Sequence, residues 1–405
     1  MKILIVSEMS VPYAVGGGEV RYGLLARELA RRGHEVTWLS MRQRQSPDEE
    51  VIDGVRHLHR GPRIAEPPAR PLVAMLRFML TAFWHVLTHR YDVVDCQTYA
   101  PLPAVWLASV LSRQKMVATI HDTSSPAVSP ASGDTTGIPD DQWVSPRDRF
   151  IVRPIEMLLY RLPYGRIVTV SQAVADTLPR RFGVNANRMT VVPNGIDTAA
   201  IATVAPSATA VDLLFVGRII PHKHVDDFLD AVATVGKTRQ ARGLSPVRAA
   251  VVGDGPLLPE MRARAADIGC VPPTAEPAVA ELPAVTIEFC GSLPDHAAVI
   301  SRMKAARLLV LPSTREGFGL VLAEALACGT ACVAYDVPAV REVLADGQAG
   351  VLVPCRDVGG LTAAIDRLLA DSAERERLVK NGQQRVAQHY TAERFTTQME
   401  AAYCQ

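Results

Sequence analysis

The chain has 405 residues, more than the ~250–300 that one hydrophobic core usually serves, so we expect two domains. Lys and Arg number 43 against 42 Asp and Glu, and this near-balance argues against nucleic acid as a main partner. The seven cysteines are scattered without a Cys-x-x-Cys pair, which predicts free thiols in a reducing compartment and no zinc site. No secretory signal is visible, and we therefore expect a cytoplasmic protein.

The first half of the chain alternates short apolar runs with helical patterns. Ile3–Val6 is typical of a strand, and a glycine loop at residues 16–18 leads into a helix that Gly33 ends. Short, fully apolar strands between helices predict a parallel sheet covered on both faces. The further strands predicted here are Glu35–Leu39, Val93–Cys96, Met116–Ile120, Arg166–Val170 and Thr190–Val192.

The alternation restarts in the second half, after a linker predicted over residues 194–206. Val211–Val216 is a predicted strand, and a helix over residues 225–235 follows it. Two such series in tandem predict an α/β protein with two doubly wound parallel-sheet domains. The further strands predicted here are Arg248–Val252, Thr286–Phe289, Leu308–Leu311 and Ala331–Ala334.

Three segments have an irregular composition, namely residues 42–68, 124–148 and 271–283. Long loops in compact domains are commonly functional. The second segment follows a predicted strand end, where sheets of this kind bind ligands, so we expect a lid or an acceptor loop there. The third is interpreted as a passive surface insertion.

The longest apolar stretch, residues 71–87, is interrupted by Arg77 and is too short to span a bilayer. It predicts a mostly buried helix. The alternative is a helix that lies on a membrane surface, with Arg77, His85, His89 and Arg90 toward the lipid headgroups. Peripheral contact with the inner face of a membrane therefore stays open.

The strongest functional signal is Glu316–Glu324, directly after an apolar strand. Gly317 and Gly319 let a ligand approach the backbone closely, and the helix that starts near Gly319 offers unpaired N–H groups and a positive dipole end. The two glutamates are placed to accept hydrogen bonds from sugar and ribose hydroxyls. Alone, the pattern is equally typical of a helix start with two solvated carboxylates.

Gly217–Lys223 carries the second signal, again after a strand. Arg218 and Lys223 leave the strand end toward the crevice where α/β sheets bind ligands. Guanidinium and ammonium groups are what a pyrophosphate requires. Alone, the segment is also typical of an exposed basic loop.

The glycines at residues 16–18 precede a helix, where backbone N–H groups can receive a phosphate. The spacing of these glycines differs from the Gly-x-Gly-x-x-Gly fingerprint of dinucleotide-binding proteins. The second strand also ends without the acidic residue that binds the ribose of NAD. Arg42 and Arg44 keep an NADP-dependent dehydrogenase open as an alternative.

Weaker signals lie at further strand ends. His121 ends the strand over residues 116–120 and is a candidate contact to the reacting sugar or the acceptor. Gly253 and the pair Ser292-Leu293 follow strands of the second half and are candidates to face a base or a phosphate. Taken singly, each segment is also typical of a plain turn.

Together these segments resemble the family-4 retaining glycosyltransferases of the GT-B fold, over nearly the whole chain. The resemblance implies two Rossmann-like domains that face a central cleft. Residues 1–197 would form the acceptor side, a last helix over 388–405 would pack back on it, and residues 198–387 would bind the nucleotide sugar. The segments that carry the resemblance are the glycine loop, His121-Asp122, Val192–Asp197, Gly217–Lys223, Val252–Pro256 and Glu316–Glu324.

The resemblance also implies roles for the matching residues. Arg218 and Lys223 would hold the donor pyrophosphate. Glu316 would contact the donor sugar, His121 would contact that sugar near its 6-position, and Glu324 would bind the ribose. The remaining donor-binding positions are Gly17, Gly18, Gly253, Ser292, Leu293, Gly317, Phe318, Gly319 and Leu320.

Two positions depart from the family pattern. His224 stands where the family commonly has Gly, which implies a differently shaped turn after Lys223. Gln97 stands at a strand end where many members have His, which leaves the acceptor chemistry open. The insertion over residues 271–283 is also longer than the usual connection.

We therefore expect sugar transfer from a nucleotide-diphosphate sugar, UDP ahead of GDP, to a hydroxyl of a lipid carrier, a glycan or a small molecule. The resemblance implies retention at the anomeric carbon. No Asp-x-Asp motif lies at a strand end, so we expect no metal and no other cofactor, the nucleotide sugar being a co-substrate. A catalytically silent nucleotide-sugar-binding protein and a sugar-nucleotide epimerase stay open as alternatives.

Overall fold

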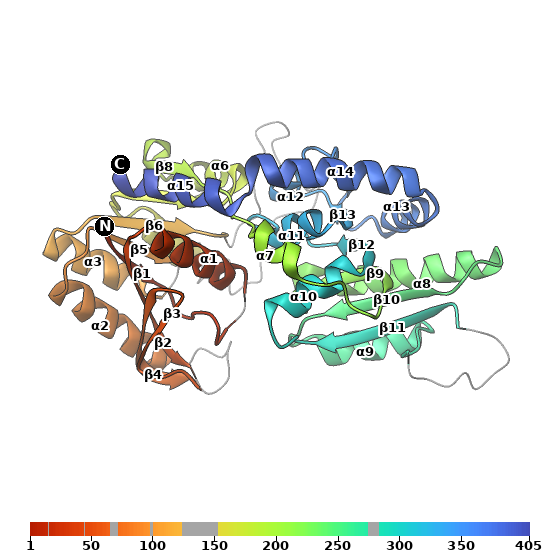
Figure 1. The fold of residues 1–405 in the computed structure, drawn as a ribbon, viewed down its shortest axis with the longest axis horizontal. Coiled ribbons are helices and arrows are strands. Elements are labelled where there is room, and N and C mark those ends of the chain that lie inside the picture. Colours follow the sequence, from red (N-terminus) through yellow and green to blue (C-terminus); the bar gives the residue numbers. More distant parts are fainter. Residues whose placement is uncertain (15, 44, 65–71, 98–99, 124–152, 274–282) are drawn as a thin grey trace. The chain divides into compact units, whose positions relative to one another are not determined.

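The computed structural model describes residues 1–405 except for residues 15, 44, 65–71, 98–99, 124–152 and 274–282. The described chain forms two compact α/β units (Figure 1). The first unit contains the described residues up to Gly195 together with Tyr390–Gln405, and the second contains those of Ile196–His389. The chain thus returns to its first unit for its last helix.

Among the described residues, the first unit carries an eight-stranded sheet in the order β3-β4-β2-β1-β5-β6-β7-β8. Neighbouring strands are parallel except for β3 and β4, which pair antiparallel. This confirms the predicted parallel α/β sheet. The strands are β1 (Lys2–Val6), β2 (Glu35–Gln43), β3 (Glu49–Ile52), β4 (Val55–Ile64), β5 (Val93–Gln97), β6 (Met116–Ile120), β7 (Arg166–Thr169) and β8 (Met189–Val191).

The expectation that residues 42–68 are irregular was wrong, because β3 and β4 form a hairpin within this segment. Asp53 and Gly54 connect the two strands with φ angles of 51° and 80°. Two successive residues with positive φ make the tight hairpin turn that Asp-Gly favours. His57 and His59 gave β4 a polar composition, although both side chains are buried in the sheet.

The helices of the first unit lie on opposite faces of its sheet. β1 leads to β2 toward one edge, whereas β4 leads to β5, and β5 to β6, toward the other, so right-handed crossovers place α1 opposite α2 and α3. α1 (Gly17–Arg31) packs against α15 (Ala392–Cys404), and α2 (Leu72–Thr88) packs against α3 (Leu102–Ser112) (Figure 1). The other helices described here are α5 (Arg153–Tyr160), α6 (Gln172–Phe182) and the 3-10 helix η2 (Ala186–Arg188).

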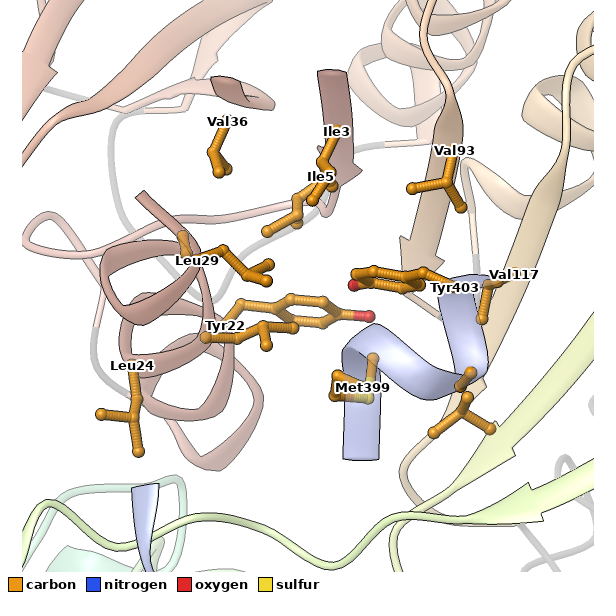
Figure 2. Close-up of a cluster of buried hydrophobic side chains, with 14 of the residues drawn as sticks. Ile3, Ile5, Tyr22, Leu24, Leu29, Val36, Val93, Val117, Met399 and Tyr403 are labelled. Carbon is orange, nitrogen blue, oxygen red and sulfur yellow. The ribbon is translucent and has the colours of Figure 1, made fainter. Parts of the chain in front are cut away.

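The core on the α1 face joins the two ends of the chain. Ile3 and Ile5 of β1, Tyr22 of α1, and Met399 and Tyr403 of α15 lie in one buried cluster (Figure 2). These side chains remove apolar area from water that neither α1 nor α15 could bury alone. The cluster therefore holds α15 on the sheet.

A buried carboxylate lies beside this cluster. Asp95 of β5 is fully buried, and its Oδ1 accepts hydrogen bonds from the Tyr22 hydroxyl at 2.9 Å and from Thr119 Oγ1 at 2.9 Å. Its Oδ2 accepts a 2.5 Å hydrogen bond from the Tyr403 hydroxyl. Burial raises the pKa of Asp95, and the three hydroxyl donors oppose that rise. Donors on both oxygens are what make a buried carboxyl tolerable.

The apolar stretch at residues 71–87 forms α2, but the expectation of a mostly buried helix was wrong for one of its faces. Ala74, Phe78, Ala82 and Val86 are buried on the face toward the protein. Large apolar side chains on the outward face stay exposed, namely Leu72, Val73, Leu76, Leu80 and Trp84.

The second unit carries, among its described residues, a six-stranded parallel sheet in the order β11-β10-β9-β12-β13-β14. The predicted linker over residues 194–206 contains a short helix, capped by Asp197 Oδ1, which accepts from the Ala200 N–H at 2.9 Å. The strands are β9 (Val211–Val216), β10 (Val247–Val252), β11 (Val285–Gly291), β12 (Ala306–Leu311), β13 (Ala331–Tyr335) and β14 (Val351–Val353). The helices are α7 (Thr198–Thr203), the 3-10 helix η3 (Pro221–Lys223), α8 (Val225–Ala241), α9 (Leu258–Asp267), α10 (His296–Lys304), α11 (Leu320–Cys328), α12 (Pro338–Val343), α13 (Val358–Ala370) and α14 (Ser372–His389).

Candidate functional site

The strand order of the second unit locates its candidate site. From β9 the chain continues to β10 and β11 on one side, and it later returns to place β12 on the other side of β9. In open parallel sheets, ligands bind beyond the carboxyl ends of the strands at such a reversal of strand order. The loops that follow β9 and β12 carry the two strongest motifs of the sequence.

These two loops are bonded to each other. The Thr314 N–H donates to the His222 carbonyl oxygen at 2.9 Å, and Ser313 Oγ donates to the same oxygen at 3.2 Å. His224 Nε2 lies 3.1 Å from Thr314 Oγ1. Bonds at successive positions fix the loop after β9 against the loop after β12.

The bonded loops bring Lys223 and Glu316 together. Lys223 Nζ lies 2.5 Å from Glu316 Oε1, and the two side chains are 16% and 12% exposed. An ion pair this far removed from water is screened much less than a surface pair. The cation and the carboxylate that the sequence placed in separate motifs are therefore neighbours at one point of the sheet edge.

Several cations gather around the same loops. Burial and neighbouring positive charges lower the pKa of His222 to about 2. The charges of Arg315, Lys223 and Arg218 are among the causes of this lowered pKa. His222 is neutral at pH 7, and the cations around it make this edge of the sheet electropositive. Sequence reasoning missed Arg315, although its place beside Glu316 in the loop was a usable signal.

The helix after β12 begins at the same place. Gly319 is the N-cap of α11 and has a φ angle of 89°, a left-handed conformation that glycine adopts without steric cost. Phe318 is buried, and Leu320 begins the helix. The first N–H groups of a helix have no partner within the helix and carry a partial positive charge. The start of α11 thus adds hydrogen-bond donors beside the cations.

Glu324 lies farther along α11 and has a partner of its own. Its Oε1 is 2.9 Å from His296 Nε2, and its side chain is 9% exposed. Burial lowers the pKa of His296, but the hydrogen bond and the charge of Glu324, with help from Asp295 and Asp197, raise it above its usual value. The structure therefore pairs Glu324 with a histidine on α10, 28 residues away.

Arg356, in the loop between β14 and α13, contacts the residues that follow the loop after β9. Its Nη1 lies 2.8 Å from Asp227 Oδ2 and also contacts His224 Nδ1. Asp227 is buried and accepts a 2.6 Å hydrogen bond from the Tyr335 hydroxyl. His224 therefore connects the start of α8 to both neighbouring loops, from a left-handed backbone with a φ angle of 45°.

Gly253 has a structural reason to be glycine. Its φ angle is 134°, and a Cβ atom there would come within 1.9 Å of the Gly217 carbonyl oxygen. The loop after β10 packs this closely on the loop after β9 because Ile219 N–H also donates to the Asp254 carbonyl at 2.9 Å. Ser292 is exposed in the loop between β11 and α10, and Leu293 beside it is half-buried. The donor-binding roles of these residues stay predictions.

In the first unit, the glycine loop forms the start of α1. Gly16 is the N-cap in an extended conformation, and Gly17 and Gly18 make up the first turn. A Cβ atom on Gly18 would lie 2.4 Å from Gln97 Nε2, at the carboxyl end of β5. Because β1 and β5 are adjacent strands at the point where this sheet reverses its order, α1 starts at the ligand-binding edge of its own unit.

His121 follows β6 at the same edge of the first unit. Burial and the Arg21 guanidinium lower the pKa of His121 to about 3, so the imidazole is neutral at pH 7. Its ring packs edge-on against Tyr22, with 5.7 Å between the ring centroids. Its Nε2 atom is buried and has no hydrogen-bond partner among the described residues. A buried, unpaired ring nitrogen is the kind of group that a substrate hydroxyl satisfies.

Other expectations fall partly outside the described residues. The predicted lid at residues 124–148 lies outside them, as does most of the insertion at 271–283. Within the described part of the chain, no group of three or more His, Cys, Asp and Glu side chains is arranged to hold a metal ion. No described helix combines the length and apolar character needed to cross a bilayer.

Comparisons with known proteins identify the family of the chain. A model of Glycosyltransferase Family 4 matches residues 15–200, and a model of Glycosyl transferases group 1 matches residues 210–371. The fold and the matched segments define a glycosyltransferase of the GT-B class. More particularly, the chain belongs to glycosyltransferase family 4.

Named relatives cover the chain nearly from end to end. The glycogen synthase of Mycobacterium tuberculosis is 29% identical over 428 residues, covering 100% of this chain and 94% of the relative. The D-inositol 3-phosphate glycosyltransferase of Geodermatophilus obscurus is 31% identical over 410 residues, covering 96% and 84%.

Solved structures share the fold. The sucrose-phosphate synthase of Thermosynechococcus elongatus superposes with a TM-score of 0.77 at 22% identity, covering 100% of this chain and 98% of that chain. The Anabaena HepE protein in complex with UDP-glucose superposes with a TM-score of 0.72 at 19% identity, covering 100% and 99%.

Proposed function

We propose that this glycosyltransferase moves a sugar from a nucleotide-diphosphate sugar, UDP ahead of GDP, to a hydroxyl acceptor with retention of the anomeric configuration. The observation that carries the proposal is the contact between Lys223 and Glu316 where the second sheet reverses its strand order. A cation for phosphate and a carboxylate for sugar hydroxyls are adjacent there, beside the start of α11. HepE, a protein of the same fold, binds UDP-glucose.

Each group then has a definite part in donor binding. Arg218 and Lys223 hold the pyrophosphate, and Arg315 joins them because it lies in the same electropositive loops. Glu316 accepts hydrogen bonds from the sugar, and Glu324 accepts them from the ribose. The α11 start, at Phe318, Gly319 and Leu320, donates backbone N–H groups to the donor phosphate or sugar oxygens.

Catalysis under this proposal is chiefly electrostatic. Negative charge develops on the leaving nucleoside diphosphate, and the prearranged cations and the α11 dipole stabilise that charge. The acceptor attacks from the face that the diphosphate leaves, and the departing phosphate takes the acceptor proton. His121 stays neutral and hydrogen-bonds the sugar near its 6-position. We propose that the reaction requires no divalent metal, so that activity survives EDTA.

For the acceptor, we propose a chemical class and no particular molecule. The relatives are named for glycogen synthesis and for transfer to D-inositol 3-phosphate, and both acceptors are polyhydroxylated. We propose a hydroxyl of a glycan, a lipid carrier or a small molecule. The seven cysteines are free thiols, which fits a cytoplasmic location, and we propose peripheral contact with a membrane as well.

A panel of nucleotide sugars tests the donor assignment. A donor present at 100 times its Kd stabilises the protein by roughly 2.7 kcal/mol, which thermal unfolding detects readily. We expect a UDP-sugar to give the largest shift and to be hydrolysed or transferred slowly. The anomeric configuration of the product, read by NMR, tests retention. A shift without turnover would identify a silent binding protein, and conversion of the donor sugar alone would identify an epimerase.

A further inference from the structure

Helices α2 and α3 form the outer layer on one face of the first unit. They pack side by side there, on the face opposite α1 and α15 (Figure 1). Helices in this position normally bury one apolar stripe on the sheet and expose a polar face to water.

α2 does not follow that rule, because it is apolar on two opposite faces. Its buried face consists of Ala74, Phe78, Ala82 and Val86. The centre of the outward face is a row of four exposed side chains, each four residues after the last. Their exposed fractions are 69% for Leu72, 50% for Leu76, 62% for Leu80 and 59% for Trp84. Val73, at 62%, widens this stripe.

α3 continues the exposed apolar surface beside α2. Leu107, Val110 and Leu111 are 44%, 52% and 60% exposed at helical spacing, while Val105 and Ala108 are buried toward the sheet. We call the outward residues of the two helices the α2–α3 apolar face. It consists of Leu72, Val73, Leu76, Leu80, Trp84, Leu107, Val110 and Leu111. Soluble monomers rarely expose such a concentration of large apolar side chains.

The charged residues on the two helices themselves are basic. α2 and α3 contain no Asp or Glu. Arg77 is exposed on α2, and Arg113, directly after α3, is exposed as well. Arg90, which follows α2, is exposed too and adds to this basic rim, and its guanidinium also donates a hydrogen bond to the Ser112 carbonyl oxygen. His85 does not belong to it, because its ring is half-buried, lies 2.8 Å from the Tyr91 hydroxyl, and has a pKa that burial lowers to about 4.

We propose that the α2–α3 apolar face docks the protein on a membrane surface that carries anionic lipid headgroups. The leucines and Trp84 enter the boundary between headgroups and acyl chains, and Arg77, Arg90 and Arg113 meet the headgroup phosphates. Trp side chains favour this interface because one end is apolar and the indole N–H stays hydrated. α2 has 17 residues, and it packs against β4 and α3 on one side while its other side stays uncovered, which suits a helix in the plane of the interface.

The same charges disfavour a second copy of the chain as the occupant. A self-complementary contact through this face would bring the basic rims of two copies together with no carboxylate on α2 or α3 to balance them. This inference rests on the membrane contact of the proposed function and specifies its surface, but it does not depend on the donor site, because it uses only residues of the first unit that have no part in donor binding.

Vesicle sedimentation tests this docking. Wild-type protein is expected to bind vesicles of phosphatidylcholine with phosphatidylglycerol, and to bind phosphatidylcholine vesicles at least tenfold more weakly. Leu80→Glu and Trp84→Glu should each reduce binding at least tenfold without changing the thermal midpoint, because both side chains are already exposed. Leu244→Glu is the matched control, since Leu244 is 45% exposed on the second unit and should bind as wild type does.

A second arm separates charge from apolar insertion. Arg77→Glu should remove the preference for anionic vesicles, and quenching of Trp fluorescence by brominated lipid should disappear in Trp84→Phe. Failure of the wild-type protein to bind anionic vesicles would overturn the proposal, and so would equal losses in Leu244→Glu and Leu80→Glu. A wild-type dimer that Leu80→Glu dissociates would instead assign the face to a second copy.

Discussion

Tyr403 donates a 2.5 Å hydrogen bond to Oδ2 of Asp95, which lies 308 residues earlier in the chain. The bond joins the last helix to the middle of the first sheet, and both residues are buried. It lies beside the cluster in which α15 covers α1 and β1. The final turn of the chain is therefore part of the core of the first unit.

The first prediction concerns this bond. Tyr403→Phe keeps the ring in the core but removes one of the three hydroxyl donors to a buried carboxyl, which should cost about 1.5–3 kcal/mol in the free energy of unfolding. Urea unfolding followed by circular dichroism measures the loss. Tyr13→Phe is the control, because Tyr13 donates to Glu50 at a half-buried site and its removal should cost less. Equal stability of Tyr403→Phe and wild type would show that Asp95 does not need this donor.

The second prediction concerns Lys223. Lys223→Ala should lower kcat with the preferred donor by about 100-fold or more, because an arranged charge on the leaving group is worth about 2.7–4 kcal/mol in the transition state. Thermal unfolding without ligand should also show a lower midpoint, because Glu316 is left without its partner, so kcat is compared at a temperature where both proteins are folded. Lys237→Ala, at an exposed position of α8, is the matched control and should keep full activity. Wild-type turnover in Lys223→Ala would remove its phosphate role.

Much of the second unit could be predicted because its strands are short and mostly apolar, and several are bounded by glycine. Val211–Val216 was predicted with the bounds that the structure has. The two loops with Lys223 and Glu316 could also be assigned to one sheet edge, since each follows a strand directly. Parallel strands leave such motifs little freedom, because their carboxyl ends all meet at that edge.

The remaining features depend on pairings that no local pattern contains. β4 was missed because its buried histidines resemble a polar loop, although Asp53-Gly54 was a usable turn signal. His296 was missed as the partner of Glu324, because the two lie on different helices. The outward face of α2 was missed for a similar reason. Composition shows an apolar helix, but only the packing shows that one of its faces remains uncovered.

The third prediction concerns His224, whose backbone adopts a left-handed conformation that costs a non-glycine residue roughly 1–2 kcal/mol. His224→Gly relieves that cost but loses the contacts to Thr314 and Arg356, so the two effects on stability should nearly cancel. His224→Ala loses the same contacts and keeps the strain, so it should be the less stable variant.

Steady-state kinetics separates the role of His224 in holding Lys223 from a role in stability. Both His224 variants should show kcat/KM lowered about three- to tenfold, since the loop that carries Lys223 loses a contact on each side. Ala345→Gly is the control for strain relief alone, because Ala345 has a φ angle of 50° away from the site and should gain stability without losing activity. Unchanged kcat/KM in His224→Gly would show that the remaining loop bonds position Lys223 without the imidazole.

The last prediction concerns the pair of His296 and Glu324. The pKa of His296 is raised in the folded protein, so the folded state binds its proton more tightly than the unfolded state. The stability from this pair is therefore fully present below the unfolded pKa of about 6.5, and it is lost as pH rises through the folded pKa. His57, His85, His121 and His222 have lowered pKa values and change stability at lower pH instead.

Unfolding free energies at pH 6 and pH 8 measure this effect. Wild type should lose stability over that interval relative to His296→Asn, by less than about 1 kcal/mol because the imidazole is 39% exposed and partly screened by water. If Glu324 binds the donor ribose, donor affinity should weaken in His296→Asn, since the carboxylate loses the group that orients it. If the unfolding free energies of wild type and His296→Asn changed equally between pH 6 and pH 8, the hydrogen bond to Glu324 would not stabilise the imidazolium.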